Sequence, residues 1–487
     1  MSHALPITTT RRAILDTLPE ETSLFGGAPT PRFTHIPASH AKALHPDVQV
    51  VMGMRGAGKS FWWAALQNEQ IRRMVAQRVP SLRLFTNATM HVGFGEKPDP
   101  DRYPGKDTLT HLLGKGHEPR LIWRTVVLRA LDWKPLCSES DWEAKINELR
   151  SNPEQVERFL YERDTRLDRD NRHVIVLFDA LDRCAADWDK MNRLIRGLLQ
   201  TALDFRPYLR LRLKLFLRTD QLDERKVANF PDASKVLSSS LELTWPVTEL
   251  YAMLFQYLGN GETDDFREAV EKQFGRLWRQ TEGVRIPDEP LARDEKNQRE
   301  VFHAITGPWM GRDRRRGFPY SWVPGHLSDA KGRTSPRSFL AAMRKAAEDS
   351  EQRYPDHEWP LHYESIKRGV QTASSIRRTE LQEDVPWVDA LLKPLGGKVV
   401  PCAFEEVASA WEQSGVMDTI QASPDSGSAR LPPAHLSEGP LGLRNDLEDL
   451  AIFLRMADDR VNIPDVFRVA YGLGRRGGVK PLRRGEG

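Results

Sequence analysis

Cysteine is scarce in this sequence of 487 residues. Only Cys137, Cys184 and Cys402 occur, and they are far apart and odd in number. This distribution excludes a disulfide framework and a zinc site built from paired cysteines. So few cysteines are typical of a protein kept in a reducing compartment, and we expect a cytoplasmic location.

Long apolar runs are also missing. No stretch approaches the roughly 18–20 apolar residues of a membrane-spanning helix. Residues 1–6 lack a basic segment followed by an apolar one, so we expect no signal peptide. We therefore expect no membrane partner.

The charge balance excludes a simple argument for nucleic acid binding. Lys and Arg number 71 and Asp and Glu 68, which gives a net charge of +3. Any such binding must depend on local patches. The sequence also lacks a metal-binding triad, a nucleophile elbow and a paired-carboxylate hydrolase site. The candidate functional residues must therefore come from another motif, which lies at residues 53–60.

Residues 53–60 read Gly-Met-Arg-Gly-Ala-Gly-Lys-Ser and follow the apolar run 48–52. We call residues 53–60 the phosphate loop, because this spacing between a strand and a helix is typical of loops that bind nucleoside triphosphates. Glycines let backbone N–H groups approach phosphate oxygens at the start of the next helix. The alternative is a glycine-rich turn with a chance Lys-Ser, which the flanking strand and helix disfavour.

The phosphate loop predicts specific roles for its residues. Lys59 supplies a cation for the β- and γ-phosphates, and Ser60 a hydroxyl for Mg²⁺. We expect ATP to be held by Gly53, Arg55, Gly56, Ala57, Gly58, Lys59, Ser60 and Phe61.

A second apolar strand, 173–179, ends in Asp179. A continuous apolar run indicates a buried parallel strand. Asp179 is our candidate to hold Mg²⁺ together with Ser60. The alternative is an Asp that caps the next helix.

Hydrolysis also needs a group that orients the attacking water. Many related ATPases have Glu directly after the strand Asp, but here that residue is Ala180. The next acid, Asp182, is our candidate for positioning the water. The alternative for Asp182 is a structural salt bridge to Arg183.

Two arginines are candidates for sensing the γ-phosphate. Arg218 lies at the end of the predicted strand 211–220, with a pair to Asp220 as the alternative. Arg337 lies in the first turn of a helix that Ser335 and Pro336 open. A cation there opposes the helix dipole, which favours an anion contact. The alternative for Arg337 is a solvated side chain.

Alternating strands and helices predict an α/β P-loop NTPase core with a parallel sheet, followed by a helical lid, and the tail after Leu441 resembles a small winged-helix-like C-terminal domain. Ligands bind at the carboxyl ends of such strands, where the motifs fall. We also expect a strand at 82–86, a loop at 87–110 and irregular structure at 281–300. The expected divisions are a leader (1–45), the ATPase core (46–260), a helical domain (261–420), a linker (421–440) and an end domain with a basic tail (441–487).

These motifs together resemble the STAND-type and KAP-like branch of the AAA+ P-loop ATPases, over about residues 33–350. The resemblance rests on the phosphate loop, on Asp179-Ala180-Leu181-Asp182-Arg183 and on Arg218-Thr219-Asp220. It implies that Arg218 stands at the sensor-1 position and Arg337 at the sensor-2 position of the lid. It also implies an ATP-driven switch, often oligomeric, with bacterial antiviral defence as a plausible setting.

Two basic clusters could contact nucleic acid. One consists of Arg312, Arg314, Arg315 and Arg316 beside aromatic residues, and the other is the C-terminal set from 475 to 484. Arginines next to aromatic rings suit backbone contacts and base stacking. The alternatives are solvated segments or contacts with an acidic protein partner.

The sequence therefore predicts a magnesium- and ATP-dependent ATPase with Lys59, Asp179, Asp182 and Arg218 as its catalytic residues. We expect a molecular switch that forms a homo-oligomer or works with a partner protein of the same system. One alternative is a DNA-binding loader or initiator ATPase. Another, motivated by Ala180, is a scaffold that binds ATP with little turnover.

Overall fold

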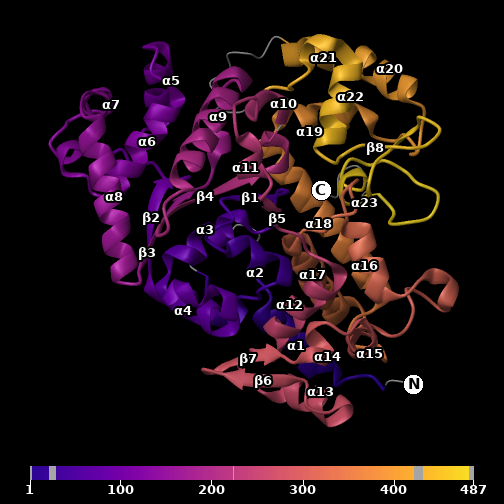
Figure 1. The fold of residues 1–487 in the computed structure, drawn as a ribbon. Helices are drawn as coiled ribbons and strands as arrows, with labels where there is room; N and C mark the ends of the chain where they lie inside the picture. Colours follow the sequence, from indigo (N-terminus) through magenta and orange to yellow (C-terminus); the bar gives the residue numbers. More distant parts are fainter. Residues whose placement is uncertain (1–2, 21–28, 223, 422–430, 482–487) are drawn as a thin grey trace. The chain divides into compact units, whose positions relative to one another are not determined.

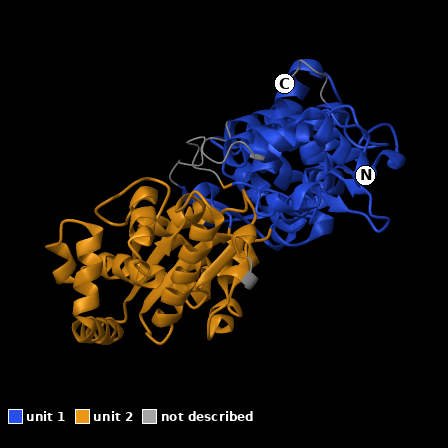
Figure 2. Ribbon diagram, turned by 90° about the horizontal axis from the view of Figure 1, so that it is seen from above, with its two compact units in different colours: residues 1–35, 245–426, 432–487 blue, residues 36–244, 427–431 orange. Residues whose placement is uncertain are grey.

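A computed structural model describes residues 3–20, 29–222, 224–421 and 431–481 (Figure 1). The chain divides into two compact units, coloured separately in Figure 2. Unit 2 comprises residues 36–244 and 427–431, and unit 1 the remainder. Among the described helices, none is long and apolar enough to cross a membrane.

Unit 2 is built on a five-stranded parallel sheet in the order β2-β3-β4-β1-β5. The strands are β1 (Val50–Gly53), β2 (Ala88–Phe94), β3 (His173–Phe178), β4 (Leu211–Arg218) and β5 (Leu241–Glu242). This confirms the predicted α/β class with a parallel sheet. In β3, Val174, Val176 and Phe178 point into one apolar core, and Ile175 and Leu177 into another. Both faces of the sheet are therefore covered.

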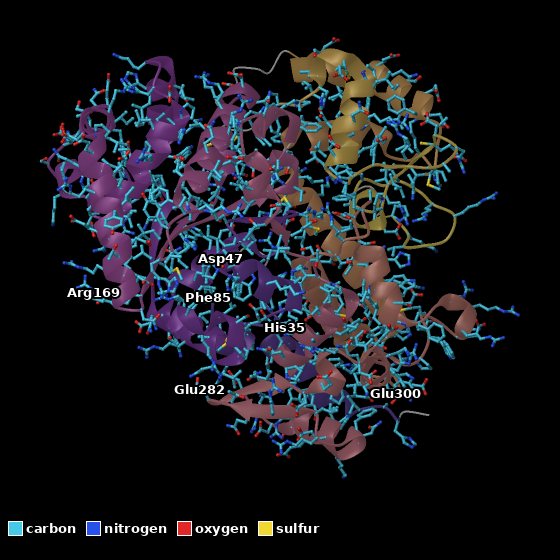
Figure 3. The ribbon with its side chains drawn as sticks, viewed as in Figure 1. His35, Asp47, Phe85, Arg169, Glu282 and Glu300 are labelled. Carbon is cyan, nitrogen blue, oxygen red and sulfur yellow. The ribbon has the colours of Figure 1, made fainter. Side chains whose placement is uncertain are left out.

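The two faces carry different helices (Figure 1). The core with Ile175 is covered by α2 (Ala38–Leu44), α3 (Lys59–Gln67), α4 (Glu69–Arg78) and the 3₁₀ helix η3 (Pro80–Asn87). Phe85 of η3, labelled in Figure 3, lies in that core. The core with Val176 is covered by α5 (Lys106–Gly114), α6 (Pro119–Ala130), α7 (Trp142–Ser151), α8 (Pro153–Arg169), α9 (Trp188–Phe205), α10 (Glu224–Val227) and α11 (Ala233–Leu237).

Two predictions in unit 2 were wrong. The expected strand at 82–86 is part of η3, and β2 lies in the segment expected to be a loop. Pro80 begins η3, where a proline is tolerated at the first helical position. The strand β2 is at the edge of the sheet, and four of its seven residues are only half-buried. Its apolar signal is therefore weak.

Unit 1 has an apolar core made by α1 (Ile7–Thr17), α12 (Val247–Gly259), α13 (Asp265–Phe274), α14 (Glu289–Ala292), α15 (Glu295–Thr306), α16 (Pro319–Leu327), α17 (Pro336–Arg353) and α18 (Tyr363–Asp384). It also contains an antiparallel pair, β6 (Trp278–Thr281) and β7 (Val284–Pro287). The expectation of irregular structure at 281–300 was wrong, because β7, α14 and the first half of α15 lie there.

A second core in unit 1 runs from Leu381 to Leu473. It is built by the end of α18 with α19 (Pro386–Leu392), α20 (Phe404–Ser414), α21 (Val416–Gln421), α22 (Gly439–Asp449), β9 (Val461–Asn462) and α23 (Asp465–Arg468), and the exposed strand β8 (Leu454–Arg455) pairs with β9. The region expected to be a separate end domain thus shares a core with residues before the linker. Its winged-helix-like character stays a prediction, and residues 422–430 and 482–487 lie outside the described residues.

The N-terminal segment is divided between the units. Residues 3–20 and 29–35 belong to unit 1, and residues 36–45 to unit 2. Buried Arg11 of α1 donates to the carbonyl oxygens of Tyr354, Pro355 and Pro360 at 2.7, 3.2 and 2.7 Å. These bonds attach α1 to the loop after α17. Unit 2 ends at Thr244, before the predicted core boundary at residue 260.

Candidate active site

The phosphate loop connects β1 to α3. Gly56 and Gly58 have φ values of 78° and 104°, a region that glycine enters at little cost. Ala57 is buried against the sheet, and α3 begins at Lys59. A Cβ atom at Gly53 would lie 3.1 Å from that of Ala57, so this position also favours glycine. The loop therefore has the strand–loop–helix arrangement that presents N–H groups to an anion.

Lys59 is folded back onto the loop. Its Nζ atom donates to the carbonyl oxygens of Gly53 and Met54 at 2.8 and 2.9 Å. Burial lowers the pKa of Lys59 to about 8, and the negative charge of Asp179 opposes this change. The ammonium group thus stays mostly charged at pH 7 and lies next to the position expected for phosphate.

Ser60 and Asp179 meet at the carboxyl end of the sheet. The Ser60 hydroxyl hydrogen-bonds to the Asp179 carboxylate. Burial raises the pKa of Asp179 above its ordinary value, while Ser60 and Lys59 act in the opposite direction. One hydroxyl and one carboxylate suit Mg²⁺, which binds a few protein oxygens and completes its shell with phosphate and water. Among the described residues, no group of three or more His, Cys, Asp or Glu side chains could hold a metal.

The chain turns sharply after Asp179. Ala180 has a φ of 55°, a left-handed conformation that is uncommon for a residue with a Cβ atom. The short 3₁₀ helix η5 (Leu181–Arg183) follows and carries Asp182. Arg183 pairs with Glu96 at 2.8 Å, whereas Asp182 lies 3.5 Å from Arg218. The proposed salt bridge between Asp182 and Arg183 was therefore wrong.

Arg218 links two acids at this edge. It is in register with Gly53 of β1, so the end of β4 lies beside the phosphate loop. Its Nε atom donates to Asp220 at 2.9 Å, and a second nitrogen completes a bidentate pair with the same carboxylate. Burial alone would raise the pKa of Asp220, but Arg218, with Arg55, holds it below its ordinary value. The alternative of an Arg218–Asp220 pair is thus realised, and Asp182 is a further partner.

Sequence reasoning gave no role to Gln221. Its side-chain oxygen accepts a hydrogen bond from the backbone N–H of Arg218 at 2.9 Å. The residue is buried, and its Nε2 atom has no hydrogen-bond partner among the described residues. Its position directly after Asp220, at the end of a buried strand, was the available signal. This amide is a further donor at the edge that holds Arg218.

The remaining predicted residues lie in different places. Phe61 is half-buried in α3, with its ring edge-on to Trp62. Arg55 acts on Asp220 through its charge. Arg337 belongs to unit 1, where it pairs with Glu380 of α18. The alternative of a solvated Arg337 was wrong, and its contact with nucleotide stays a prediction.

No protein-family model and no curated protein matches this sequence. Solved structures do match its fold at low similarity. The ORC2 protein of Aeropyrum pernix, solved with ADPNP and ADP, is 13% identical, with 92% of this chain and 95% of that chain covered and a TM-score of 0.40. Cdc6p of Pyrobaculum aerophilum is 10% identical, with 93% of this chain and 95% of that chain covered and a TM-score of 0.32. A Walker-type ATPase of Pyrococcus abyssi is 11% identical, with 91% of this chain and 97% of that chain covered and a TM-score of 0.34. Conclusions about function therefore depend on the site itself.

Proposed function

We propose that this chain binds and hydrolyses ATP and uses the nucleotide state as a switch. The observation that carries this proposal is the grouping of Lys59, Ser60 and Asp179 at one sheet edge, with Arg218 in register with the loop. A buried cation, a hydroxyl–carboxylate pair and inward-facing N–H groups are the elements that phosphoryl transfer from a nucleotide needs.

Each residue has a defined task in this proposal. Lys59 leaves the carbonyls of Gly53 and Met54 and donates to phosphate oxygens. Ser60 and Asp179 hold Mg²⁺, which neutralises phosphate charge when bound. Asp182, beside the cation of Arg218, accepts a proton from the attacking water or orients it. Arg218 contacts the γ-phosphate and transmits its loss to Asp182 and Asp220.

The proposal is tested by ATP binding and phosphate release with Mg²⁺. Lys59→Ala should weaken ATP binding about 10- to 100-fold, the effect expected for lost charged hydrogen bonds. Lys42→Ala, an exposed lysine at the end of α2, is its control. Asp182→Asn should lower kcat by about 10²-fold or more with little change in ATP affinity. Asp189→Asn, an exposed acid in the first turn of α9, is the matched control.

The outcomes separate the candidate functions. ATP binding without turnover would reject the switch and favour the scaffold that the residue Ala180 suggested. No binding at all would reject both. The STAND-type branch and a defence role depend on the motif resemblance alone, and nothing in the structure favours them over an initiator-type ATPase.

A nucleic-acid-dependent ATPase is the second candidate. It is favoured by one observation, that residues adjoining both basic clusters line a single pocket in unit 1. Measuring turnover with and without DNA distinguishes it, because stimulation by DNA is expected only for this candidate.

A further inference from the structure

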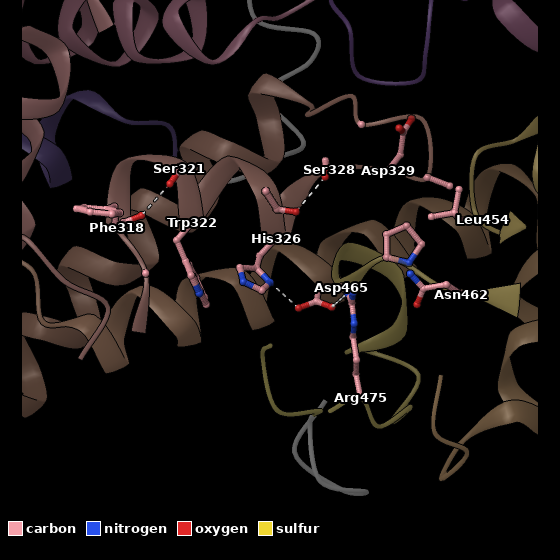
Figure 4. A pocket seen from close by; sticks show the side chains of 15 residues that line it. Phe318, Ser321, Trp322, His326, Ser328, Asp329, Leu454, Asn462, Asp465 and Arg475 are labelled. Atoms are coloured by element: carbon pink, nitrogen blue, oxygen red, sulfur yellow. Dashed lines mark hydrogen bonds and ion pairs between the residues drawn. The ribbon is translucent and has the colours of Figure 1, made fainter. Parts of the chain in front are cut away.

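A pocket of about 520 Å³ lies within unit 1 (Figure 4). Its wall comes from α16 and the turn that follows, from the β8–β9 pair with α23, and from Arg475. Ligand pockets for small molecules have volumes of roughly 300–1,000 Å³. The pocket is therefore large enough for one flat heterocycle.

One side of the pocket is aromatic. The Trp322 ring lies against His326, with centroids 4.0 Å apart, and Phe318 nearby is 43% exposed. His326 is fixed in turn, because its Nδ1 atom lies 2.6 Å from a carboxylate oxygen of Asp465. The Phe318 ring already packs against Trp309, with centroids 4.9 Å apart, so half-buried Trp322 is the ring on which a base can stack.

The polar side of the pocket has one unused acceptor. Asn462 of β9 is 7% exposed, and its Oδ1 atom has no hydrogen-bond partner among the described residues. Buried polar atoms without a partner are costly, so a ligand that donates an N–H there would gain free energy. Nucleobases carry such donors on their edges.

The acids that line the pocket already have partners. Asp465 accepts from buried Arg468 at 2.7 Å and contacts Arg475 at 3.5 Å. Burial opposes its ionisation, but His326 and Arg468 lower the pKa of Asp465 to about 2. Asp329 accepts from the side chain of Arg333 at 3.0 Å. These carboxylates are thus neutralised internally and do not repel an anion strongly.

Both basic clusters of the sequence adjoin this pocket. Arg312, Arg314, Arg315 and Arg316 are exposed and directly precede Gly317 and Phe318 in its wall. Arg475 lines it, and exposed Arg476 and Lys480 follow. Arg483 and Arg484 lie outside the described residues. The cations extend beyond the pocket, which suits a polymer of phosphates better than a single nucleotide.

We propose that this pocket takes one base of a single-stranded nucleic acid. The base stacks on Trp322, its edge donates to Asn462, and the flanking phosphates run along the two basic clusters. A duplex keeps its base faces covered, so it can use only the clusters. This inference belongs with the second candidate function but does not require ATP turnover.

The test is fluorescence anisotropy of the full chain with a labelled 20-nucleotide oligothymidylate and with a 20-base-pair duplex. The single strand should bind more tightly. Trp322→Leu should weaken single-strand binding about 5- to 150-fold, the loss expected for one base–aromatic stack, and leave duplex binding unchanged. Trp322→Phe should keep most of the affinity. Trp387→Leu, a half-buried Trp of α19, is the matched control.

Further measurements distinguish base stacking in the pocket from the alternative modes of binding. Replacing Arg314, Arg315 and Arg316 with Gln should weaken binding of both ligands and reduce the magnitude of the slope of log affinity against log salt by about 2 for the single strand and about 3 for the duplex. Equal affinity for the two ligands, or no effect of Trp322→Leu, would overturn the proposal. Competition by thymidine monophosphate at the same nucleotide concentration would also overturn it in favour of a free-nucleotide site.

The failure of this inference can be told apart from failure of the ATPase. Binding is measured without ATP and with Lys59→Ala. Retained binding there, with no ATP turnover in the wild type, rejects the ATPase and keeps the pocket. ATP turnover by the wild type without a preference for single strands rejects the pocket proposal and keeps the ATPase.

Discussion

Lys214 allows a quantitative test of how unit 2 is held together. It lies in the middle of β4, fully buried, and its Nζ atom donates to the carbonyl oxygens of Ala43, His45 and Val48 at 2.8, 3.0 and 2.7 Å. It thus joins the end of α2 and the segment before β1 to the sheet. Replacing it with Met keeps most of the volume but removes the charge and the donors.

The size of the effect of Lys214 on stability follows from its pKa. Burial lowers the pKa of Lys214 from 10.5 to about 7. At about 1.4 kcal/mol for each pH unit, burying the charged form costs about 5 kcal/mol below pH 7. Between these two pKa values the unfolded chain binds a proton that the folded chain releases, and the neutral amine then keeps at most two of its three hydrogen bonds. The stability of the wild type therefore rises with pH there, by up to ~1.4 kcal/mol per unit.

The assay is hydrogen exchange of the β4 amides, corrected for the intrinsic rate. Relative to Lys214→Met, the opening free energy of the wild type should increase by about 2 kcal/mol from pH 7.5 to pH 9. Lys235→Met, which removes an exposed lysine paired with Asp232, should follow the wild type. Parallel pH profiles for wild type and Lys214→Met would refute the reasoning, because they would mean that Lys214 titrates alike in both states.

Other substitutions test local geometry. Ala180→Gly should raise the melting temperature, because glycine relieves a left-handed φ of 55° that costs Ala about 1 kcal/mol. Gly369→Ala should lower the free energy of unfolding by about 1–3 kcal/mol, since its Cβ would lie 2.2 Å from the carbonyl oxygen of Ala342. The control is Gly114→Ala, whose Cβ meets no atom within 4 Å, so it should not lower the free energy of unfolding. Arg11→Met should release α1, seen as faster limited proteolysis, because three carbonyls lose their donor.

The central strands were predictable from sequence because burial on both faces leaves a continuous apolar run. This holds for 173–178, where five of six residues are buried. The edge strand β2 was not predictable, because the half-buried His91 and the buried Gly93 interrupt its apolar pattern. The first half of α15 was also missed, because residues 295–300 are all polar or charged and the buried apolar residues Val301, Phe302 and Ile305 come only after them.

The candidate site residues could be chosen from the sequence, but their pairings could not. The phosphate loop and Asp179 follow from spacing and from the strand ends. Nothing in the sequence says whether Asp182 pairs with Arg183 or with Arg218. That choice depends on the order of the sheet, because β4 lies between β1 and β3 and brings Arg218 between the two motifs. Strand order is a property of tertiary packing, and a single sequence shows it only indirectly.

The turn at Ala180 explains how this chain can lack the Glu that commonly follows the strand Asp. A left-handed residue directly after β3 reverses the chain, and η5 then carries the next acid back beside β4. Asp182 reaches Arg218 in this way, at 3.5 Å, while the Ser60 hydroxyl hydrogen-bonds to Asp179. A small side chain at residue 180 suits such a turn, because a β-branched or bulky residue would be a genuine outlier at positive φ. The spacing Asp-Ala-Leu-Asp is therefore a geometric solution that keeps a second carboxylate at the sheet edge, and turnover of the Asp182→Asn variant measures whether that carboxylate acts in hydrolysis.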